Sequence, residues 1–508
     1  MGRAVAAAVL VACLAGTGAV VTDGFPNPAT DAAAQWYLTQ DNAWSFWPAR
    51  PALAPIKVAV IDSGIDYGHP EFAGRIVAGR SFVGGSWKRD TDGHGTFVAG
   101  EIAADPINGI GIAGLAFNAE LLIAKVVTPD DSVSLPGEIE AIRWAADRGA
   151  RVINLSLGGV RDPLNARLDT HSAAEQSAIA YAYSKGAIVV AAVGNGSESP
   201  ATPWDYADYP AALPHVIGVG AIRRNGSVPA YSNRDALYVD LVAPGDGILS
   251  TVPRNLVDTS SPSCTGNPYS NCGPFEYRNA IGTSFAAPQV SAAAALVLGE
   301  DPTLTADQVS WLLERSAADM KPSTGCAQCA LGRDRYTGWG RLDVAHALRM
   351  LTAGIRLPPP DRYASNDGNG RFAQRFGPAR TITASVDFWD DPADIYAITL
   401  PTGRGLFARL TPKAPNQEAR IALVLWKPGR YPVAQTPPPP GRQAALAITV
   451  HGQQRIAFEV RSGGTYYIEA KLNTRTYYPV VYTLAIATRA GHVRAPSNGS
   501  TGTRKVHS

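Results

Sequence analysis

Three residues with the side chains needed for serine-based hydrolysis lie far apart in the chain. Asp62 ends the apolar run KVAVID, His94 follows in DGHGT, and Ser284 lies in GTSFAAP. A serine hydroxyl becomes a nucleophile when a base takes its proton, and a histidine oriented by a carboxylate is such a base. Each residue alone also suits an ordinary role in a turn or helix cap. Together they predict acyl transfer by an activated serine.

The elements that must position these residues are those of an α/β domain. Continuous apolar runs predict strands that are buried on both faces of a parallel sheet. The runs cover residues 57–62, 121–127, 151–157, 187–194, 216–222 and 239–245, and helical spacing covers 136–149 and 173–186. Alternation of strands and helices predicts a three-layer fold with a mostly parallel central sheet and right-handed crossovers. Functional loops are then expected at the carboxyl ends of the strands, where Asp62 and Asn195 both fall.

The motifs resemble those of the subtilisin-like serine proteases over about residues 25 to 350. They are VAVIDSG, DGHGT, INLSLGG, AAVGN, VAPG and GTSFAAP, with the order Asp, His, Ser along the chain. The resemblance implies an endopeptidase that cleaves polypeptides through an acyl-enzyme, with Asp62, His94 and Ser284 as the triad. It also implies that Asn195 donates to the oxyanion. A left-handed turn after a strand is the alternative role for Asn195.

The resemblance further implies where a substrate binds. Ser156, Leu157, Gly158 and Gly159 would offer an edge to which an extended peptide adds as a strand. Asp208, in ADYPAALP, corresponds to the base of the pocket for the residue before the cleaved bond. A carboxylate there would favour Arg or Lys through charge-assisted hydrogen bonds, whereas a solvent-exposed loop aspartate would not. We therefore expect broad cleavage with enhanced acceptance of basic residues.

A structural Ca²⁺ site is another implication of the resemblance. The loop Pro106–Ile112, PINGIGI, is similar to the calcium loop of the family, and Ca²⁺ takes about six to eight oxygen ligands. Glu71 replaces the usual Asp and the loop begins with proline, so an altered site or an ordinary surface loop is the alternative. The expected ligands are the side chains of Glu71, Asn108 and Gln35 and the carbonyl groups of Pro106, Ile110 and Ile112.

The length of 508 residues predicts two to three domains. Alternating apolar runs after a Pro- and Gly-rich break predict a small antiparallel β-sandwich, which resembles domains found after secreted bacterial peptidases. The expected organisation is a secretory signal at 1–21, an arm at 22–55 similar to the surface arm of thermitase-like members, a peptidase domain at 56–350, a linker at 351–377, the β-sandwich at 378–488 and a disordered tail at 489–508.

The cysteines bear on two predictions, the export of the protein and its disulfide bonds. Cys13 follows a lipoprotein-like Leu-Val-Ala sequence, so lipid anchoring and ordinary signal cleavage are both open. An exported chain meets oxidising conditions, so we expect disulfides between Cys264 and Cys272 and between Cys326 and Cys329. A four-cysteine zinc site is the alternative.

The formal net charge of +2 and the 17% content of charged residues argue against a nucleic-acid partner. No segment after the signal is long and apolar enough for a membrane span, and we expect a monomer that is secreted or held in the cell envelope. Two other functions stay open: a narrow-specificity processing protease anchored by lipid, and a catalytically silent surface-binding protein. The complete set of Asp62, His94, Ser284 and Asn195 argues against the silent protein.

Overall fold

The computed structural model describes two compact units, residues 1–360 and 361–508. The residues described are 3–4, 34–43, 53–257, 276–357, 373–377, 379–386, 393–414, 420–428, 443–450, 452–472 and 480–490. The expectations for most of the signal segment, for most of the arm, for Cys13, for Cys264 and Cys272, for most of the linker and for residues 491–508 fall on residues outside this set. Arg489 and Ala490, which were expected in a disordered tail, instead end the last strand.

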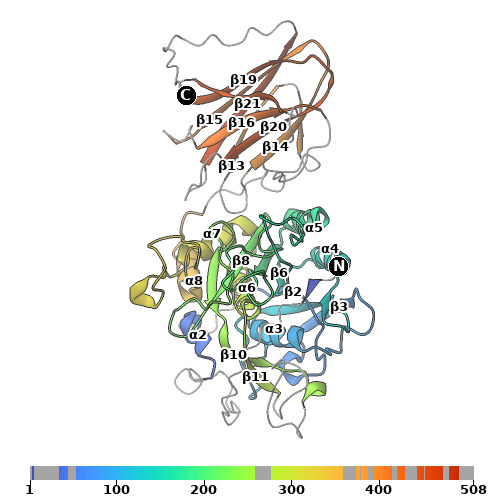
Figure 1. The fold of residues 1–508 in the computed structure, drawn as a ribbon, viewed down its shortest axis with the longest axis vertical. Helices are drawn as coiled ribbons and strands as arrows, with labels where there is room; N and C mark the ends of the chain where they lie inside the picture. The colour runs from blue at the N-terminus through green and yellow to red at the C-terminus, as the bar shows by residue number, and fades with distance from the viewer. Residues whose placement is uncertain are drawn as a thin grey trace. The chain divides into compact units, whose positions relative to one another are not determined.

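The first unit contains a seven-stranded sheet with the order β3-β4-β2-β6-β7-β8-β9 (Figure 1). Every pair of neighbouring strands is parallel, which confirms the predicted mostly parallel sheet. The strands are β2 (Ile56–Asp62), β3 (Ile76–Ser81), β4 (Ala119–Lys125), β6 (Val152–Leu155), β7 (Ile188–Ala192), β8 (Val216–Ile222) and β9 (Leu241–Pro244). Strand β3 was not predicted, because it lies at the edge of the sheet and is only partly buried.

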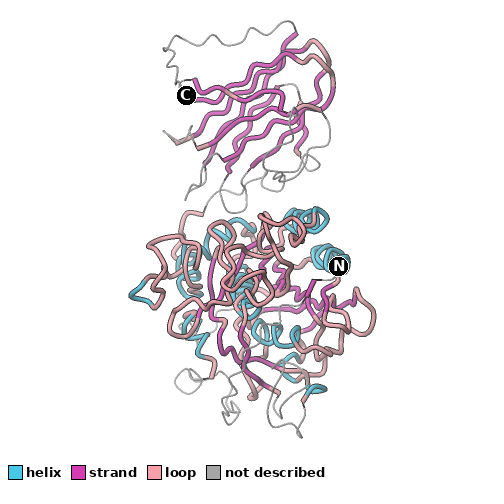
Figure 2. Tube along the Cα trace, in the orientation of Figure 1, coloured by secondary structure: helices cyan, strands magenta, loops and turns pink. Residues whose placement is uncertain are grey.

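Helices cover both faces of this sheet, as Figure 2 shows in cyan and magenta. On β2, Val58 and Val60 belong to the same core as helices α3, α6, α7 and α8, whereas Ala59 and Ile61 belong to the core with α4 and α5. Successive side chains of a strand point to opposite faces, so the predicted three-layer fold is confirmed. The helices are α3 (His94–Ala103), α4 (Leu135–Asp147), α5 (Ala173–Ser184), α6 (Ala287–Glu300), α7 (Ala306–Ser316) and α8 (Val344–Thr352).

Helix α6 runs through the core, and its alanines let neighbouring elements approach closely. Residues 287–299 are all buried, and Pro288 in the first turn is compatible with a helix start. The antiparallel ribbon β10 (Asp246–Thr251) and β11 (Tyr277–Ile281) leads into this helix through the short helix η4 (Thr283–Phe285). Gly282, at φ 152°, joins the ribbon to η4. This chain path brings Ser284 to the end of the sheet.

The N-terminal arm contributes the short helix α2 (Trp36–Gln40), whose first three residues are buried in the main core. Trp36 Nε1 donates to the carbonyl of Gly247 at 3.1 Å, and the Tyr37 hydroxyl donates to that of Leu249 at 2.8 Å. This part of the arm is therefore packed into the peptidase unit. The remaining short elements are β1 (Arg3–Ala4), which pairs with β5 (Ser132–Val133), and η2 (Pro70–Phe72), η3 (Arg254–Leu256) and η5 (Pro322–Thr324).

The second unit is a sandwich of two five-stranded sheets, with the orders β12-β14-β20-β16-β17 and β13-β21-β15-β19-β18. All pairs are antiparallel except β12 with β14. Side chains from both sheets form one core, in which the hydroxyls of Tyr396 and Tyr482 lie 2.6 Å apart. The predicted β-sandwich is confirmed. Its strands are β12 (Gln374–Phe376), β13 (Ala379–Val386), β14 (Ala393–Leu400), β15 (Arg404–Pro412), β16 (Ile421–Trp426), β17 (Gln443–Leu446), β18 (Ile448–Val450), β19 (Gln453–Glu459), β20 (Gly464–Leu472) and β21 (Val480–Ala490).

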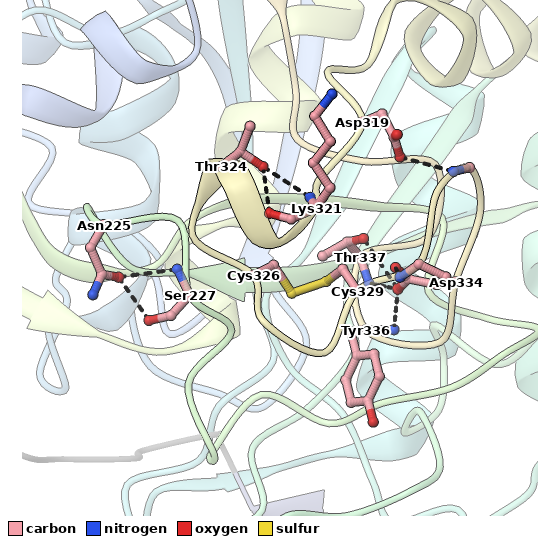
Figure 3. The surroundings of a disulfide bond; sticks show 12 residues. Asn225, Ser227, Asp319, Lys321, Thr324, Cys326, Cys329, Asp334, Tyr336 and Thr337 are labelled. Carbon is pink, nitrogen blue, oxygen red and sulfur yellow. Dashed lines mark hydrogen bonds between the residues drawn. A yellow bond between two sulfur atoms is a disulfide. The ribbon is translucent and has the colours of Figure 1, made fainter.

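The predicted bridge between Cys326 and Cys329 is present (Figure 3), with the Cα atoms 5.4 Å apart. Both cysteines are buried. Because the disulfide uses these two sulfurs, they are not free thiolates for the alternative zinc site. Among the described residues, no helix has both the length and the apolar character that crossing a membrane requires.

Candidate active site

Asp62 and His94 meet at the carboxyl edge of the parallel sheet. Asp62 is the last residue of β2 and His94 is the first residue of α3. His94 Nδ1 lies 2.9 Å from each Asp62 carboxylate oxygen, and both side chains are buried. A carboxylate at this ring nitrogen orients the imidazole and selects the tautomer in which Nδ1 carries the proton.

Three carboxylates act on the His94 ring. Burial alone would lower the pKa of His94, but the charge and hydrogen bond of Asp62, followed by the charges of Asp92 and Asp90, outweigh burial and raise it. Asp92 accepts a hydrogen bond from the His94 backbone N–H at 3.0 Å. Burial and the charge of Asp90 raise the pKa of Asp92 to about 7.

Ser284 lies in η4, directly before Phe285, and the Phe285 ring contacts that of His94. The rings of His94 and Phe285 have centroids 5.5 Å apart. The Ser284 hydroxyl donates to the Ser156 carbonyl at 3.2 Å, and the Ser156 hydroxyl donates to the Ser284 carbonyl at 2.7 Å. The structure therefore brings the three predicted residues to one edge of the sheet and fixes Ser284 against the segment after β6.

Asn195 follows β7 and contacts the residue directly before Ser284. Its side-chain oxygen accepts hydrogen bonds from the Thr283 backbone N–H at 3.1 Å and from the Thr283 hydroxyl at 3.2 Å. A backbone N–H can only donate, so the atom that it meets is the amide oxygen. Asn195 Nδ2 is buried and has no hydrogen-bond partner within the described part of the chain. Such a fixed N–H donor suits a developing oxyanion.

Asp208 lies between two glycines near the same edge. A Cβ on Gly158 would come 3.7 Å from the Asp208 Cβ, and a Cβ on Gly194 would collide with Asp208 Oδ2. Asp208 is only 4% exposed, so it is not the solvent-exposed aspartate of the alternative interpretation. Gly159 forms a two-hydrogen-bond bridge with Tyr209, at 2.8 and 2.9 Å. The 156–159 segment and Asp208 are thus adjacent.

The residues of the expected calcium loop also lie together, but they contact one another through hydrogen bonds. The Glu71 carboxylate accepts from Asn108 Nδ2 at 2.9 Å, from the Ile112 N–H at 2.9 Å and from the Tyr277 hydroxyl at 3.0 Å. The amide oxygen of Asn108 accepts instead from the N–H of Ile110. Because donors face the carboxylate and the Asn108 oxygen faces away, this arrangement does not fit a calcium ion.

Gln35 also differs from the expected calcium ligand. Its side-chain amide pairs with both backbone groups of Ala113, each at 2.9 Å. Within the described residues, there is no group of three or more His, Cys, Asp or Glu side chains arranged for a metal. Pro106 lies in the same loop, at its start. Tyr277 could not be identified from the sequence, because it lies 206 positions from Glu71.

Two further residues lie near the edge: Thr283, which had no predicted role of its own, and Asp90, which the sequence predicts to be a loop or N-cap aspartate. Thr283 orients Asn195, and its place in GTSFAAP was the available signal. Asp90 accepts from the backbone N–H groups of Gly93 and Thr96 at 2.8 and 2.9 Å and from the Ser63 hydroxyl at 2.9 Å. It therefore fixes the loop that begins α3, which is the structural role expected of a loop aspartate.

Asp, His and Ser side chains at the carboxyl edge of the sheet in a three-layer α/β fold are the arrangement of a serine hydrolase. The chain belongs to the subtilase family, peptidase S8, whose model matches residues 54–340. It is 36% identical to subtilisin DY of Bacillus licheniformis over 58% of this chain and 91% of that protein, and 35% identical to thermitase of Thermoactinomyces vulgaris over 48% and 75%.

Two other comparisons give the extent of the likeness. A thermophilic serine proteinase of Bacillus sp. (strain AK1) is 36% identical, but the match spans only 55% of its length and 50% of this chain. Among solved structures, a lanthipeptide protease superposes with a TM-score of 0.51 at 26% identity, covering 63% of this chain and 94% of that one.

Proposed function

We propose that the protein is an exported serine endopeptidase that cleaves polypeptides through an acyl-enzyme, with broad specificity and enhanced acceptance of basic residues. The observation that carries this proposal is the geometry at one sheet edge: Asp62 is hydrogen-bonded to His94; Phe285, the residue after Ser284, contacts the His94 ring; and the Asn195 amide is bonded to Thr283, the residue before Ser284. Membership of the subtilase family supports it independently.

The proposed steps assign one role to each side chain. As the Ser284 Oγ bonds to the substrate carbonyl carbon, His94 takes the proton of the Ser284 hydroxyl. His94 later gives that proton to the leaving amine as the C–N bond breaks. Asp62 holds the ring and stabilises the imidazolium. Asn195 Nδ2 and the Ser284 backbone N–H donate to the oxyanion, whose charge is larger in the transition state than in the substrate. Water then hydrolyses the acyl-enzyme.

The substrate would bind along residues 156–159 as an added strand. Broad specificity is then expected, because hydrogen bonds between backbone groups do not depend on the side chains of the substrate. Burial of Asp208 beside Gly158 supports its role at the base of the primary pocket. A buried carboxylate there favours the charged side chains of Arg and Lys.

Location outside the cytoplasm is supported by the Cys326–Cys329 disulfide, since such bonds persist in oxidising compartments. Cleavage of the signal near Ala19 and lipid anchoring at Cys13 are alternative outcomes of the same export. Fractionation of cells into medium, membrane and soluble fractions separates a released enzyme from an anchored one. A monomer remains our expectation.

The family resemblance implies a structural calcium ion, but the hydrogen bonds of Glu71 and Asn108 argue against one in the present arrangement of the loop. Binding at the loop would require the Asn108 amide to turn its oxygen towards the ion and the Glu71 carboxylate to release its protein donors. No catalytic step depends on this ion.

Fluorophosphonate labelling of the purified chain tests the proposed function. We expect covalent labelling and peptide hydrolysis in wild type, and loss of both in Ser284→Ala. Ser291→Ala is a matched control, because Ser291 is buried in α6 and bonds to Asn154; it should retain labelling. Absence of labelling in folded wild-type protein would favour the silent binding protein, and a peptide library would define the cleavage preference of an active one.

A further inference from the structure

Charge is divided unevenly between the two units of the chain. Residues 361–508 carry 19 Lys and Arg against 9 Asp and Glu, a formal net charge of +10. Residues 1–360 carry 26 Lys and Arg against 34 Asp and Glu, a formal net charge of −8. The overall charge of +2 therefore conceals an acidic first unit and a strongly basic second unit. Such an asymmetry indicates that the basic unit has an anionic partner.

Burial increases this imbalance at the surface of the second unit. Three acidic residues belong to the part of this unit that the structure describes. Asp394 is fully buried and Glu469 is 5% exposed, whereas Glu459 is partly exposed at the end of β19. None of the described Lys and Arg side chains of the unit is buried. The surface of the β-sandwich is therefore more basic than its composition.

One sheet of the sandwich carries part of this charge on its outer face. The sheet is β13-β21-β15-β19-β18 (Figure 1), and we call its outer face the basic face. On the central strand β15, Leu406, Ala408 and Leu410 belong to the core of the sandwich. Successive side chains of a strand point to opposite faces, so Phe407 and Arg409 project from the basic face.

Two arginines lie directly opposite each other on the basic face. Arg409 of β15 is the register partner of Arg455 of β19. Like charges directly opposite each other destabilise a sheet. The Arg455 guanidinium donates to Gln453 Oε1 at 2.7 and 3.2 Å, and neither arginine has a carboxylate partner among the residues that the structure describes. The two charges are therefore not balanced within the sheet, and an anionic ligand would balance them.

A third arginine extends this cluster along the sheet. Phe407 lies two residues from Arg409 on β15, and the guanidinium carbon of Arg489 lies 5.6 Å from the centroid of its ring. The register partners of Phe407 on the flanking strands are Ala457 and Ala487. Because these neighbours are small, the arginines and Phe407 are the largest side chains on this part of the basic face.

The spacing of the arginines favours a polymer over a small anion. Arg489 pairs with Gly405, which lies four residues from Arg409 on β15, and four residues span about 13 Å along a strand. A chain that carries repeated anionic groups can contact both ends of such a site. The three cations are all arginines, whose planar forks match carboxylate and phosphate groups through paired hydrogen bonds.

Nucleic acid and a lipid bilayer fit the basic face less well. Single-stranded nucleic acid is bound through aromatic rings on which its bases stack, whereas Arg489 already lies over the Phe407 ring. Stable attachment to a bilayer adds buried apolar side chains to charge attraction. Within the described ranges of the second unit, the exposed large hydrophobic residue is Leu446, which belongs to β17 of the other sheet. Carboxylates carried by a glycan chain need neither feature.

We propose that the basic face binds an acidic polysaccharide, with Arg409 and Arg455 as the central contacts and Arg489 extending the site. Each guanidinium binds a carboxylate of the polymer through two parallel N–H···O hydrogen bonds. This binding site goes beyond the proposed peptidase activity and does not depend on it. Its consequence is that the second unit holds the enzyme at a surface that displays such a polymer.

The test measures binding of the full chain to polygalacturonate, a polymer of carboxylate-bearing sugars, by isothermal titration calorimetry at low ionic strength. Neutral dextran is the uncharged comparison. We expect polygalacturonate to bind, added salt to weaken its binding through screening, and dextran not to bind. Arg409→Gln should weaken the binding of polygalacturonate about 5-fold, in line with the loss of one well-formed exposed ion pair. The double variant Arg409→Gln, Arg455→Gln should weaken it further.

Arg375→Gln is the matched control, because Arg375 is exposed and belongs to β12 of the other sheet. It removes the same charge from the same unit, and it should bind polygalacturonate as wild type does. An equal loss of affinity in Arg375→Gln and Arg409→Gln would show that net charge alone attracts the polymer, and would overturn the assignment to the basic face.

Two further probes test the choice of ligand. A single-stranded DNA oligonucleotide and vesicles that contain an anionic phospholipid should each bind more weakly than polygalacturonate. Tighter binding of either probe, or no binding of polygalacturonate, would overturn the proposal. The circular dichroism of each variant should equal that of wild type, because the substituted side chains are at the surface. Failure of the peptidase proposal is distinct, since it would appear as absent fluorophosphonate labelling and would leave polymer binding unchanged.

Discussion

Thr283 holds the side chain of Asn195 with two hydrogen bonds, one from its backbone N–H and one from its hydroxyl, both to the same amide oxygen. These contacts join the loop after β7 to the residue before Ser284. The proposed oxyanion donor and the proposed nucleophile are therefore positioned by one connection, in which the Asn195 amide uses its oxygen and leaves Nδ2 for other contacts.

Asn195→Ala should lower kcat by about 100-fold or more with a small change in KM, because the amide acts on charge that develops in the transition state. In subtilisin itself, a member of this family, loss of the equivalent donor costs about 2.7–4 kcal/mol. The measurement is steady-state hydrolysis of a peptide amide, with exposed Asn225→Ala as the control. A loss confined to KM would show that the amide binds substrate and transition state equally.

The acidic limb of the kcat/KM profile should lie above pH 6.5, because His94 must be neutral to act as the base and its folded-state pKa is raised. Asp92→Asn removes one of the charges that raise this pKa while keeping an acceptor for the His94 N–H, so the limb should move to lower pH. Exposed Asp130→Asn is the control. A limb that stays in place in Asp92→Asn would mean that Asp92 does not act on His94 in the working enzyme.

Chelation of calcium should leave the melting temperature unchanged, because Asn108, Ile112 and Tyr277 satisfy the Glu71 carboxylate without an ion. Thermal unfolding with a chelator, and after adding back Ca²⁺, measures this. If the melting temperature fell by several degrees and Ca²⁺ restored it, the loop would rearrange around an ion as the family resemblance implies.

Tyr37→Phe should lower the free energy of unfolding by about 1–3 kcal/mol, the usual cost of leaving a buried hydrogen-bonding group unpaired. The hydroxyl donates to Leu249 and accepts from Gln35 Nε2, so both partners lose a bond. Urea unfolding measures the change. Tyr181→Phe, at a half-buried tyrosine whose hydroxyl bonds to Asp147, should cost less; equal effects would show that the hydrogen bonds of the buried Tyr37 hydroxyl contribute no more than that of a partly exposed one.

The sequence alone was sufficient to predict the inner strands, because a strand that is covered on both faces must be apolar at nearly every position. This is why β2, β4, β6, β7, β8 and β9 were all predicted, whereas the partly exposed β3 was not. The same reasoning located Asp62 and Asn195 at strand ends, and alternation of apolar and polar residues predicted the β-sandwich. The proposed chemistry of Asp62, His94 and Ser284 follows from residue type and chain order.

Only the tertiary structure decided how side chains from distant segments meet. Tyr277 reaches Glu71, Thr283 fixes Asn195, and Asp208 is buried beside Gly158, although no local pattern signals any of these contacts. Whether a carboxyl group binds a metal, a protein donor or a substrate depends on burial and on which atoms face it. Local sequence determines secondary structure through periodicity, but the surroundings of a polar group arise from the packing of segments far apart in the chain.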